Sequence, residues 1–199
     1  MRSWVLLVMP VILLAGILVG GCQVEEDPQH LNMRWGIPEE VTGFEGLERE
    51  PQGEEVTKIN QDQLEVVWRP GESYILPISS TANKELEAVR YYGENIPSTL
   101  EVDWLDPHER QWYPLEEIPQ EKIHAEIEQE NQLLTIDFGP PQGANFEEDM
   151  TRVIWFRLTP QKIEEWEMEI HGYLWEEESP DRQQISNPIK LEAEVTENE

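Results

Sequence analysis

Hydrophobic and polar residues alternate with a period of two along most of the chain after residue 60. In the clearest case, one side of the pattern is occupied by Trp166, Met168, Ile170, Gly172 and Leu174. The other side carries Glu165, Glu167, Glu169, His171, Tyr173 and Trp175. Successive side chains of a β-strand point to opposite faces, so this period predicts strands with one buried and one solvent-facing side.

Two parts of this pattern are interrupted by short turns, which predicts two hairpins. Residues 100–115 predict the first hairpin, with a turn at Asp106, Pro107, His108 and Glu109. Residues 123–138 predict the second, with a turn at 129–131. Residues 153–158, in contrast, are almost continuously large and hydrophobic. That run indicates a central strand buried on both faces.

The spacing of these segments predicts the fold class. With residues 64–68, 74–78 and 86–92 included, the pattern gives about ten strands at close spacing, which is typical of a sandwich or barrel. No long amphipathic helix competes with them. We therefore predict an all-β fold, a single antiparallel β-sandwich with an immunoglobulin-like layout, over residues 61–199. The paired cysteines of antibody domains are absent, because the chain has one cysteine.

The amino terminus has a different pattern, a basic start followed by an uncharged apolar stretch at residues 4–21. This layout is typical of a signal peptide. At its end, Cys22 is preceded by Val19, Gly20 and Gly21. These residues resemble the lipobox of bacterial lipoproteins, and the resemblance covers residues 1–22. It implies export by residues 1–21, cleavage between Gly21 and Cys22, and a lipid anchor on the Cys22 thiol.

A lipid anchor also explains the cysteine content of the chain. Cys22 is the only cysteine, and lipidation gives a role to a thiol that has no partner for a disulfide. The alternative is an uncleaved transmembrane helix, since residues 4–21 just reach the length needed to span a bilayer. Pro10 and the glycines near residue 20 argue against that helix. The predicted location is therefore the extracytoplasmic face of a membrane, with acylated Cys22 in the bilayer.

Residues 23–60 are rich in acidic residues, proline and glycine, and this composition predicts a flexible tether. Within it, the residues that alternate with polar or small ones are Leu31, Met33, Trp35 and Ile37. This alternation leaves two alternatives, a strand added to the chain's own domain or one added to a partner's sheet edge. The predicted organisation is a signal peptide at 1–21, a lipidated cysteine and acidic linker at 22–60, and a β-sandwich domain at 61–199.

The charge balance restricts the partners that the domain can have. The chain carries 42 acidic and 14 basic residues, for a net charge of −28. Nucleic acid and anionic lipid head groups would be repelled, so we predict no nucleic-acid partner. A surface this acidic also suits high salt, where screening relieves self-repulsion. Stabilisation by salt is therefore a hypothesis about this domain.

Catalytic motifs are missing from the sequence. Neither GxSxG nor SxxK occurs, and the only thiol lies in the lipobox. His108 and Glu109 begin as a zinc-peptidase motif does, but Trp112 stands where the second histidine is required. The remaining histidines lie far apart in the sequence, at His30, His124 and His171. We predict no enzyme, no cofactor and no metal. The alternative is a small extracytoplasmic hydrolase that uses a Glu/Asp pair.

Aromatic residues give the one positive signal for binding, because the chain has eight tryptophans. The alternation places Tyr173 and Trp175 on the acidic side of their strand, and in the adjacent pair Trp112 and Tyr113 one ring must point away from the core. Exposed rings can stack on sugars or anchor a protein partner. The alternative is that loops or neighbouring strands cover them. We predict an acidic, non-catalytic module that uses these four residues to bind a protein or glycan of the cell envelope.

Overall fold

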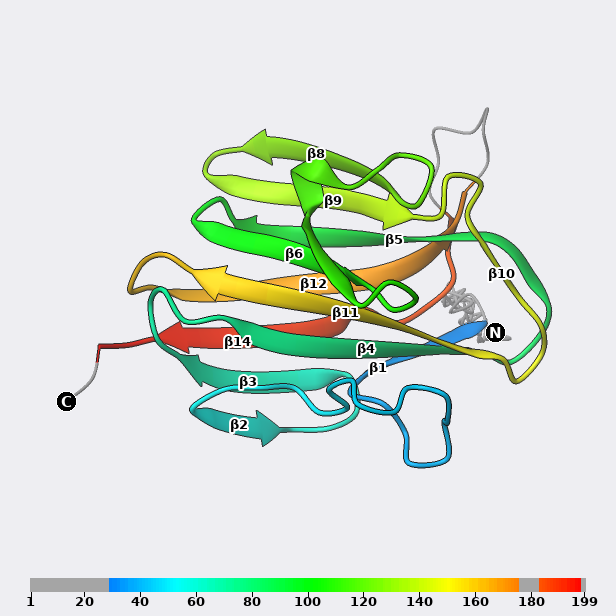
Figure 1. Cartoon of the computed structure of the whole chain (residues 1–199), viewed down its shortest axis with the longest axis horizontal. Helices are drawn as coiled ribbons and strands as arrows, with labels where there is room; N and C mark the ends of the chain where they lie inside the picture. Colours follow the sequence, from blue (N-terminus) through cyan, green and yellow to red (C-terminus); the bar gives the residue numbers. More distant parts are fainter. Residues whose placement is uncertain (1–28, 176–182, 198–199) are drawn as a thin grey trace, which may run out of the picture.

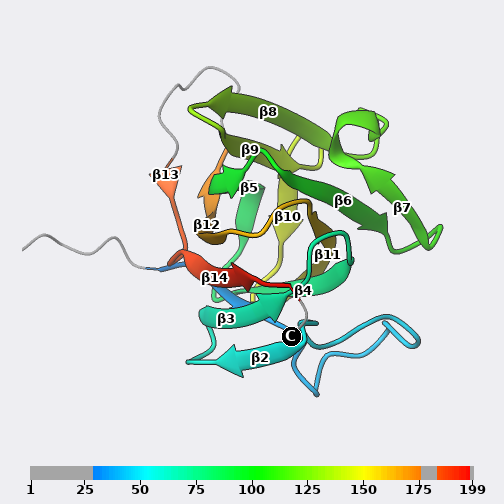
Figure 2. The ribbon, with the colours of Figure 1, turned by 90° about the vertical axis from the view of Figure 1, so that its left-hand side faces the viewer.

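The fold is a sandwich of two β-sheets (Figures 1 and 2). A computed structural model describes residues 29–175 and 183–197 of the 199-residue chain. The predicted signal peptide, Cys22 and the start of the predicted tether lie outside the described residues. Within the described part, no helix is long and apolar enough to cross a membrane. The prediction of an all-β sandwich is confirmed.

The first sheet has five strands in the order β1-β4-β11-β6-β7, and all neighbours are antiparallel. In that order, the strands span Leu31–Trp35, Tyr74–Ala82, Thr151–Pro160, Leu100–Asp106 and Gln111–Pro114. The predicted central strand is confirmed, because β11 lies between β4 and β6. The predicted first hairpin is confirmed as β6 and β7. A single 3₁₀ turn, η1 at Leu115–Glu117, follows β7.

The second sheet has nine strands, seven of them in the order β2-β3-β14-β12-β5-β9-β8. These seven span Glu55–Lys58, Gln63–Trp68, Ile189–Val195, Glu165–Leu174, Leu86–Pro97, Leu133–Gly139 and His124–Glu130. Two short strands complete it, β10 (Ala144–Phe146) beside β5 and β13 (Gln183–Gln184) beside β12. The second hairpin is confirmed as β8 and β9. One pair departs from the antiparallel arrangement, because β3 and β14 run parallel.

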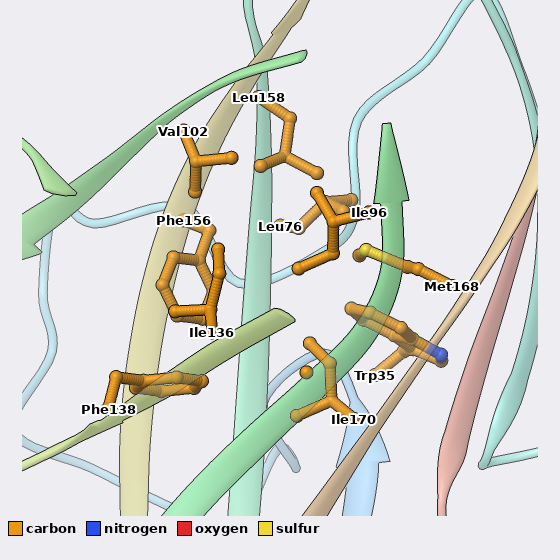
Figure 3. A pocket seen from close by; sticks show the side chains of 11 residues that line it. Trp35, Leu76, Ile96, Val102, Ile136, Phe138, Phe156, Leu158, Met168 and Ile170 are labelled. Carbon is orange, nitrogen blue, oxygen red and sulfur yellow. The ribbon is translucent and has the colours of Figure 1, made fainter. Parts of the chain in front are cut away.

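The core lies between the two sheets, where the apolar sides of the strands face each other. Trp68 is fully buried, and its ring stacks on Tyr74 with 5.1 Å between centroids. Phe138 of β9 meets Phe156 of β11 edge to face at 5.0 Å, so aromatic contacts link the sheets. A cavity of about 20 Å³ remains among purely apolar side chains (Figure 3). A cavity this small has room for at most one water and no polar partner to hold it.

Part of the predicted tether belongs to the folded domain. Leu31, Met33 and Trp35 of β1 are at most 4% exposed, and β1 pairs with β4 in a continuous register. The Trp35 indole Nε1 also donates a hydrogen bond to the Lys190 carbonyl oxygen at 2.9 Å, which ties β1 to the second sheet. Of the two alternatives, the strand therefore joins its own domain. The tether prediction is wrong over Leu31–Lys58, and the folded part begins before residue 61.

The segment after β1 covers the outer face of the first sheet. Trp155 of β11 is 1% exposed, and its indole Nε1 donates to the Glu48 carbonyl oxygen at 2.7 Å. The Phe44 ring packs edge to face on Trp155 with 5.0 Å between centroids. Ile37 and Leu105 are buried in the same cluster. We call this region the covered face, because the chain supplies its own cover for it.

Candidate functional site

The predicted aromatic site does not form as one surface, and Tyr173 is the clearest departure. Its side chain is 2% exposed, although the alternation places it on the solvent side of β12. Its hydroxyl donates a hydrogen bond to Asp137 Oδ2 of β9 at 2.5 Å. The burial of the ring leaves Tyr173 no exposed face with which to contact a partner, contrary to the prediction.

The other three predicted residues are half-buried and lie apart. Trp175 follows β12 in the second sheet, and the Arg90 guanidinium lies 4.0 Å from the centre of its ring. Trp112 packs against the covered face of the first sheet, under Arg157. Tyr113 points the other way, toward the core, so the adjacent rings face opposite sides of β7. These rings form no common aromatic platform.

A groove opens instead where β6 of the first sheet faces the β8–β9 hairpin of the second. Its volume is about 770 Å³. The turn η1 contacts both β6 and β8 and so closes one end. We call this region the open groove. Sequence reasoning identified both hairpins but missed the groove, because their separation depends on how the two sheets diverge.

The open groove has an apolar floor and an acidic rim. The apolar side chains that line it are Leu100, Val102, Leu115, Ile118, Ala125, Ile127, Leu134 and Ile136. The rim carries the exposed carboxylates Glu101, Glu116 and Glu117, for which the described residues provide no ion pair. Asp103 also lines the groove, but its Oδ2 is 2.6 Å from Arg157 Nη2. None of the lining residues is aromatic.

An ion-paired cluster holds the end wall of the groove in place. Lys122 Nζ lies 2.7 Å from Asp106 Oδ2 and 2.6 Å from Glu109 Oε2, so it ties the segment after η1 to the β6–β7 turn. Asp106 also accepts hydrogen bonds from the backbone amides of His108 at 2.9 Å and Glu109 at 3.1 Å. This is the role of His108 in the structure, a turn residue.

The charges of this cluster depend on one another. Burial disfavours the ionised form of Asp106, but the hydrogen bonds from Lys122 and from the two turn amides outweigh it and lower the pKa of the carboxyl group. Hydrogen bonds from Lys122 and Tyr113 lower the pKa of Glu109 as well. Those two carboxylates in turn raise the pKa of Lys122. A general acid needs a raised pKa, so neither carboxyl group supports the hydrolase alternative.

A second hollow, of about 610 Å³, lies on the outside of the second sheet. Its carboxylates come from Glu55, Glu65, Glu165, Glu167, Glu192 and Glu194. In the strand register Glu167 is opposite Glu192, and Glu192 is opposite Glu65. We call it the acidic hollow. Within the described ranges, no three His, Cys, Asp or Glu side chains are grouped so that they could hold a metal ion.

Comparison with known proteins identifies no family. No protein-family model matches the sequence, and no curated protein matches it. A cohesin module from a Clostridium perfringens family 33 glycoside hydrolase is similar at 12% identity and a TM-score of 0.39, over 72% of this chain and 96% of that one. The collagen-binding subdomain of the Enterococcus faecalis surface protein ACE is similar at 11% and 0.31, over 62% and 90%.

A third similar structure is a family 123 glycoside hydrolase from Clostridium perfringens, at 12% identity and a TM-score of 0.37. It is matched over 69% of this chain, which spans only 23% of that protein. Likeness at these levels carries no function from those proteins to this one. The class that the structure defines is a two-sheet β-sandwich, and its function has to be argued from its own surface.

Proposed function

We propose that this chain is a membrane-anchored extracytoplasmic lipoprotein whose sandwich binds a protein partner at the cell envelope, without catalysis. The observation that carries the binding role is the open groove, which combines an apolar floor with exposed carboxylates at its rim that form no ion pair within the described residues. Apolar surface that water can reach is costly, and sizeable patches of it typically mark interaction sites. The anchor rests on residues 1–22, where the lipobox resemblance lies.

A protein partner suits the groove better than a glycan. Sugar rings are commonly held by stacking on aromatic side chains, whereas the groove is lined by aliphatic residues such as Val102, Ile127 and Leu134. The rings that could stack on a sugar lie elsewhere, on different faces of the two sheets. Aliphatic floors with charged rims match the usual anatomy of a protein–protein interface, an apolar centre inside a polar border.

Lipid labelling tests the anchor. In cells that express the full chain, labelled fatty acid should be incorporated into the protein and lost in the Cys22→Ser variant, which cannot form the thioether to the lipid. The variant should also leave the membrane fraction, because two buried acyl chains supply the membrane affinity in this proposal. Label retained by Cys22→Ser would contradict the anchor.

Crosslinking in membranes tests the binding role. A protein partner crosslinked to the full chain should be lost when Ile127→Lys places a charge on the groove floor. The matched control is Thr57→Lys, which adds the same charge to an exposed strand position in the acidic hollow. A partner that survives Ile127→Lys and disappears with Thr57→Lys would contradict binding at the groove. The fold of both variants is checked by circular dichroism.

A further inference from the structure

We propose that the open groove receives an extended, positively charged segment of the partner protein, which adds as a strand to the free edge of β8. This inference rests on the proposed function and specifies the chemistry of the partner. Its support comes from the edge of β8, from the two faces of that strand, and from the charge around it.

The edge of β8 is suited to pair with another strand. β8 is the last strand of the second sheet, and among the described strands it pairs only with β9. The pairing runs from His124 opposite Gly139 to Glu130 opposite Leu133 without a register shift, and the strand contains no proline. A regular strand with one unpaired edge presents a row of backbone donors and acceptors to an incoming strand.

The other edges of the two sheets are less suited to pair with an incoming strand. Of the outermost strands of the two sheets, β8 has seven residues, whereas β1 has five and β2 and β7 have four each. β7 ends at Pro114, which has no amide hydrogen to donate. The groove borders β8 along its length, because Ala125, Ile127 and Gln129 all line it. Backbone pairing and side-chain pockets therefore coincide at this edge.

The side chains of β8 alternate between the groove and the opposite, exposed face. A strand added beside β8 would follow the same alternation. Ala125, Ile127 and Gln129 face the groove, while Glu128 and Glu130 alternate with them and are exposed. A strand added beside β8 would send every second side chain into the groove and the others to the opposite face. Apolar side chains of the segment would then reach the floor formed with Leu134 and η1.

The carboxylates around β8 favour a positively charged segment. Glu116 and Glu117 border the groove, and Glu128 and Glu130 lie on the opposite face of β8. Lysine or arginine side chains would meet carboxylates on either side of an added strand. A second copy of this chain would instead bring a net charge of −28 to an acidic edge. The charge therefore favours a basic segment of a different protein over self-association.

Peptide binding to the full chain, purified in detergent, tests the inference. The probe is a blocked peptide as long as β8 in which lysine alternates with valine, and its affinity is measured by fluorescence anisotropy. Removing two rim charges with Glu116→Gln and Glu117→Gln should weaken binding by about threefold to tenfold, the range expected for two exposed charge pairs. The same peptide with glutamate in place of lysine should not bind.

A matched pair of substitutions separates local recognition from general attraction to an acidic protein. Glu65→Gln and Glu194→Gln remove the same charge from the acidic hollow, and they should change the affinity by less than about twofold because screening is strong beyond a Debye length of ~10 Å at 0.1 M salt. An equal loss of affinity in both double variants would overturn the inference, since net charge alone would then explain binding.

Amide hydrogen exchange tests the strand addition itself. Saturating peptide should slow exchange within residues 124–130, and a peptide with proline in place of alternate valines should fail to do so. Protection at β2, or no protection at β8 despite binding, would overturn the inference. If the peptide fails but the membrane partner still depends on Ile127, the strand mode is wrong while the proposed binding role stands.

Discussion

The covered face and the open groove are two apolar surfaces on the same sandwich, and they differ in what lies over them. Over the covered face, the segment after β1 places Phe44 and the Glu48 carbonyl on Trp155, which leaves that ring 1% exposed. At the open groove, Val102, Ile127 and Leu134 pack against the core but stay only half-buried. The chain therefore covers one of its apolar surfaces and leaves the other accessible.

This difference distinguishes the groove from the covered face, although single exposed apolar residues such as Ile59 and Ile163 also lie elsewhere on the surface. Acidity is common to the groove and the acidic hollow, so charge alone does not mark a binding site in a chain this acidic. The groove differs from the acidic hollow in its larger set of aliphatic side chains and in the longer edge strand beside it, β8 with seven residues against β2 with four. Substitutions on the covered face should therefore affect stability more than binding. Substitutions in the open groove should affect binding more than stability.

The largest expected effect is on the covered face. Trp155→Ala should lower the free energy of unfolding by about 3–5 kcal/mol, because it removes a fully buried ring and the hydrogen bond that holds the covering segment. Urea denaturation measures this change. Trp112→Ala is the control, since that ring is only half-buried at the edge of the same cluster and should cost less than half as much. Equal losses of unfolding free energy in the two variants would contradict the conclusion that the segment after β1 covers this face.

The next effect concerns the end wall of the groove. Asp106→Ala should lower the free energy of unfolding by about 1–3 kcal/mol, because the buried carboxylate accepts hydrogen bonds from two turn amides and from Lys122. Thermal unfolding measures this change. Asp106→Asn keeps an acceptor for the turn amides and should lower the free energy of unfolding less. The difference between the two variants separates the contribution of the turn hydrogen bonds from that of the ion pair.

The same residue predicts a pH dependence. The pKa of Asp106 is lower in the folded state than its ordinary value of about 3.9, so its ionised form stabilises the fold at pH values above that range. This stabilisation is lost as the pH falls through the lowered pKa of the folded state. The stability difference between the wild type and Asp106→Asn should shrink in that acidic window. A difference that persists below it would contradict the account.

The acidic hollow should give a smaller effect of the opposite sign. Glu192 is opposite both Glu65 and Glu167, and like charges at opposed strand positions repel. Glu192→Gln should therefore raise the free energy of unfolding by about 0.5 kcal/mol at low salt. Salt should stabilise the wild type more than this variant, because screening weakens the same repulsion. Equal stability of the wild type at low and high salt would remove this explanation.

A similarly small effect on stability is expected at the groove floor. Ile127→Thr keeps a β-branched side chain at a half-buried strand position, so it should change the free energy of unfolding by about 0.5–1 kcal/mol. Its effect on peptide affinity should exceed that of Ile163→Thr, the same change at an exposed position between β11 and β12. Anisotropy titrations of both variants check this, and indistinguishable affinities would contradict a functional floor.

Much of the fold follows from the sequence because alternation reports directly which strand faces are buried. The β6–β7 and β8–β9 hairpins and the central position of β11 were all predictable in this way. Composition misled the prediction for residues 31–58, where charges and prolines suggested a tether although β1 and β2 pair within the sheets. The parallel pairing of β3 with β14 could not be foreseen, since it joins strands far apart in the chain.

The site was harder to predict because it depends on what lies above each strand. Alternation placed Tyr173 on a solvent face, but its hydroxyl reaches Asp137 of β9, two strands away in the same sheet, and the ring is buried. The groove arises from the divergence of two hairpins that belong to different sheets, and no local pattern reports that distance. The signal that could have indicated it is the pair of apolar residues Ala125 and Ile127, which alternate with acidic ones along β8.

Site-specific photocrosslinking in native membranes tests the central claim most directly. A photoreactive residue at Gln129, which is exposed at the groove, should crosslink one discrete protein through a segment rich in lysine or arginine, and the product should disappear with Ile127→Lys. The same residue at Thr57, in the acidic hollow, should give no such product. A product that forms at Thr57 and not at Gln129 would contradict the open groove as the binding site.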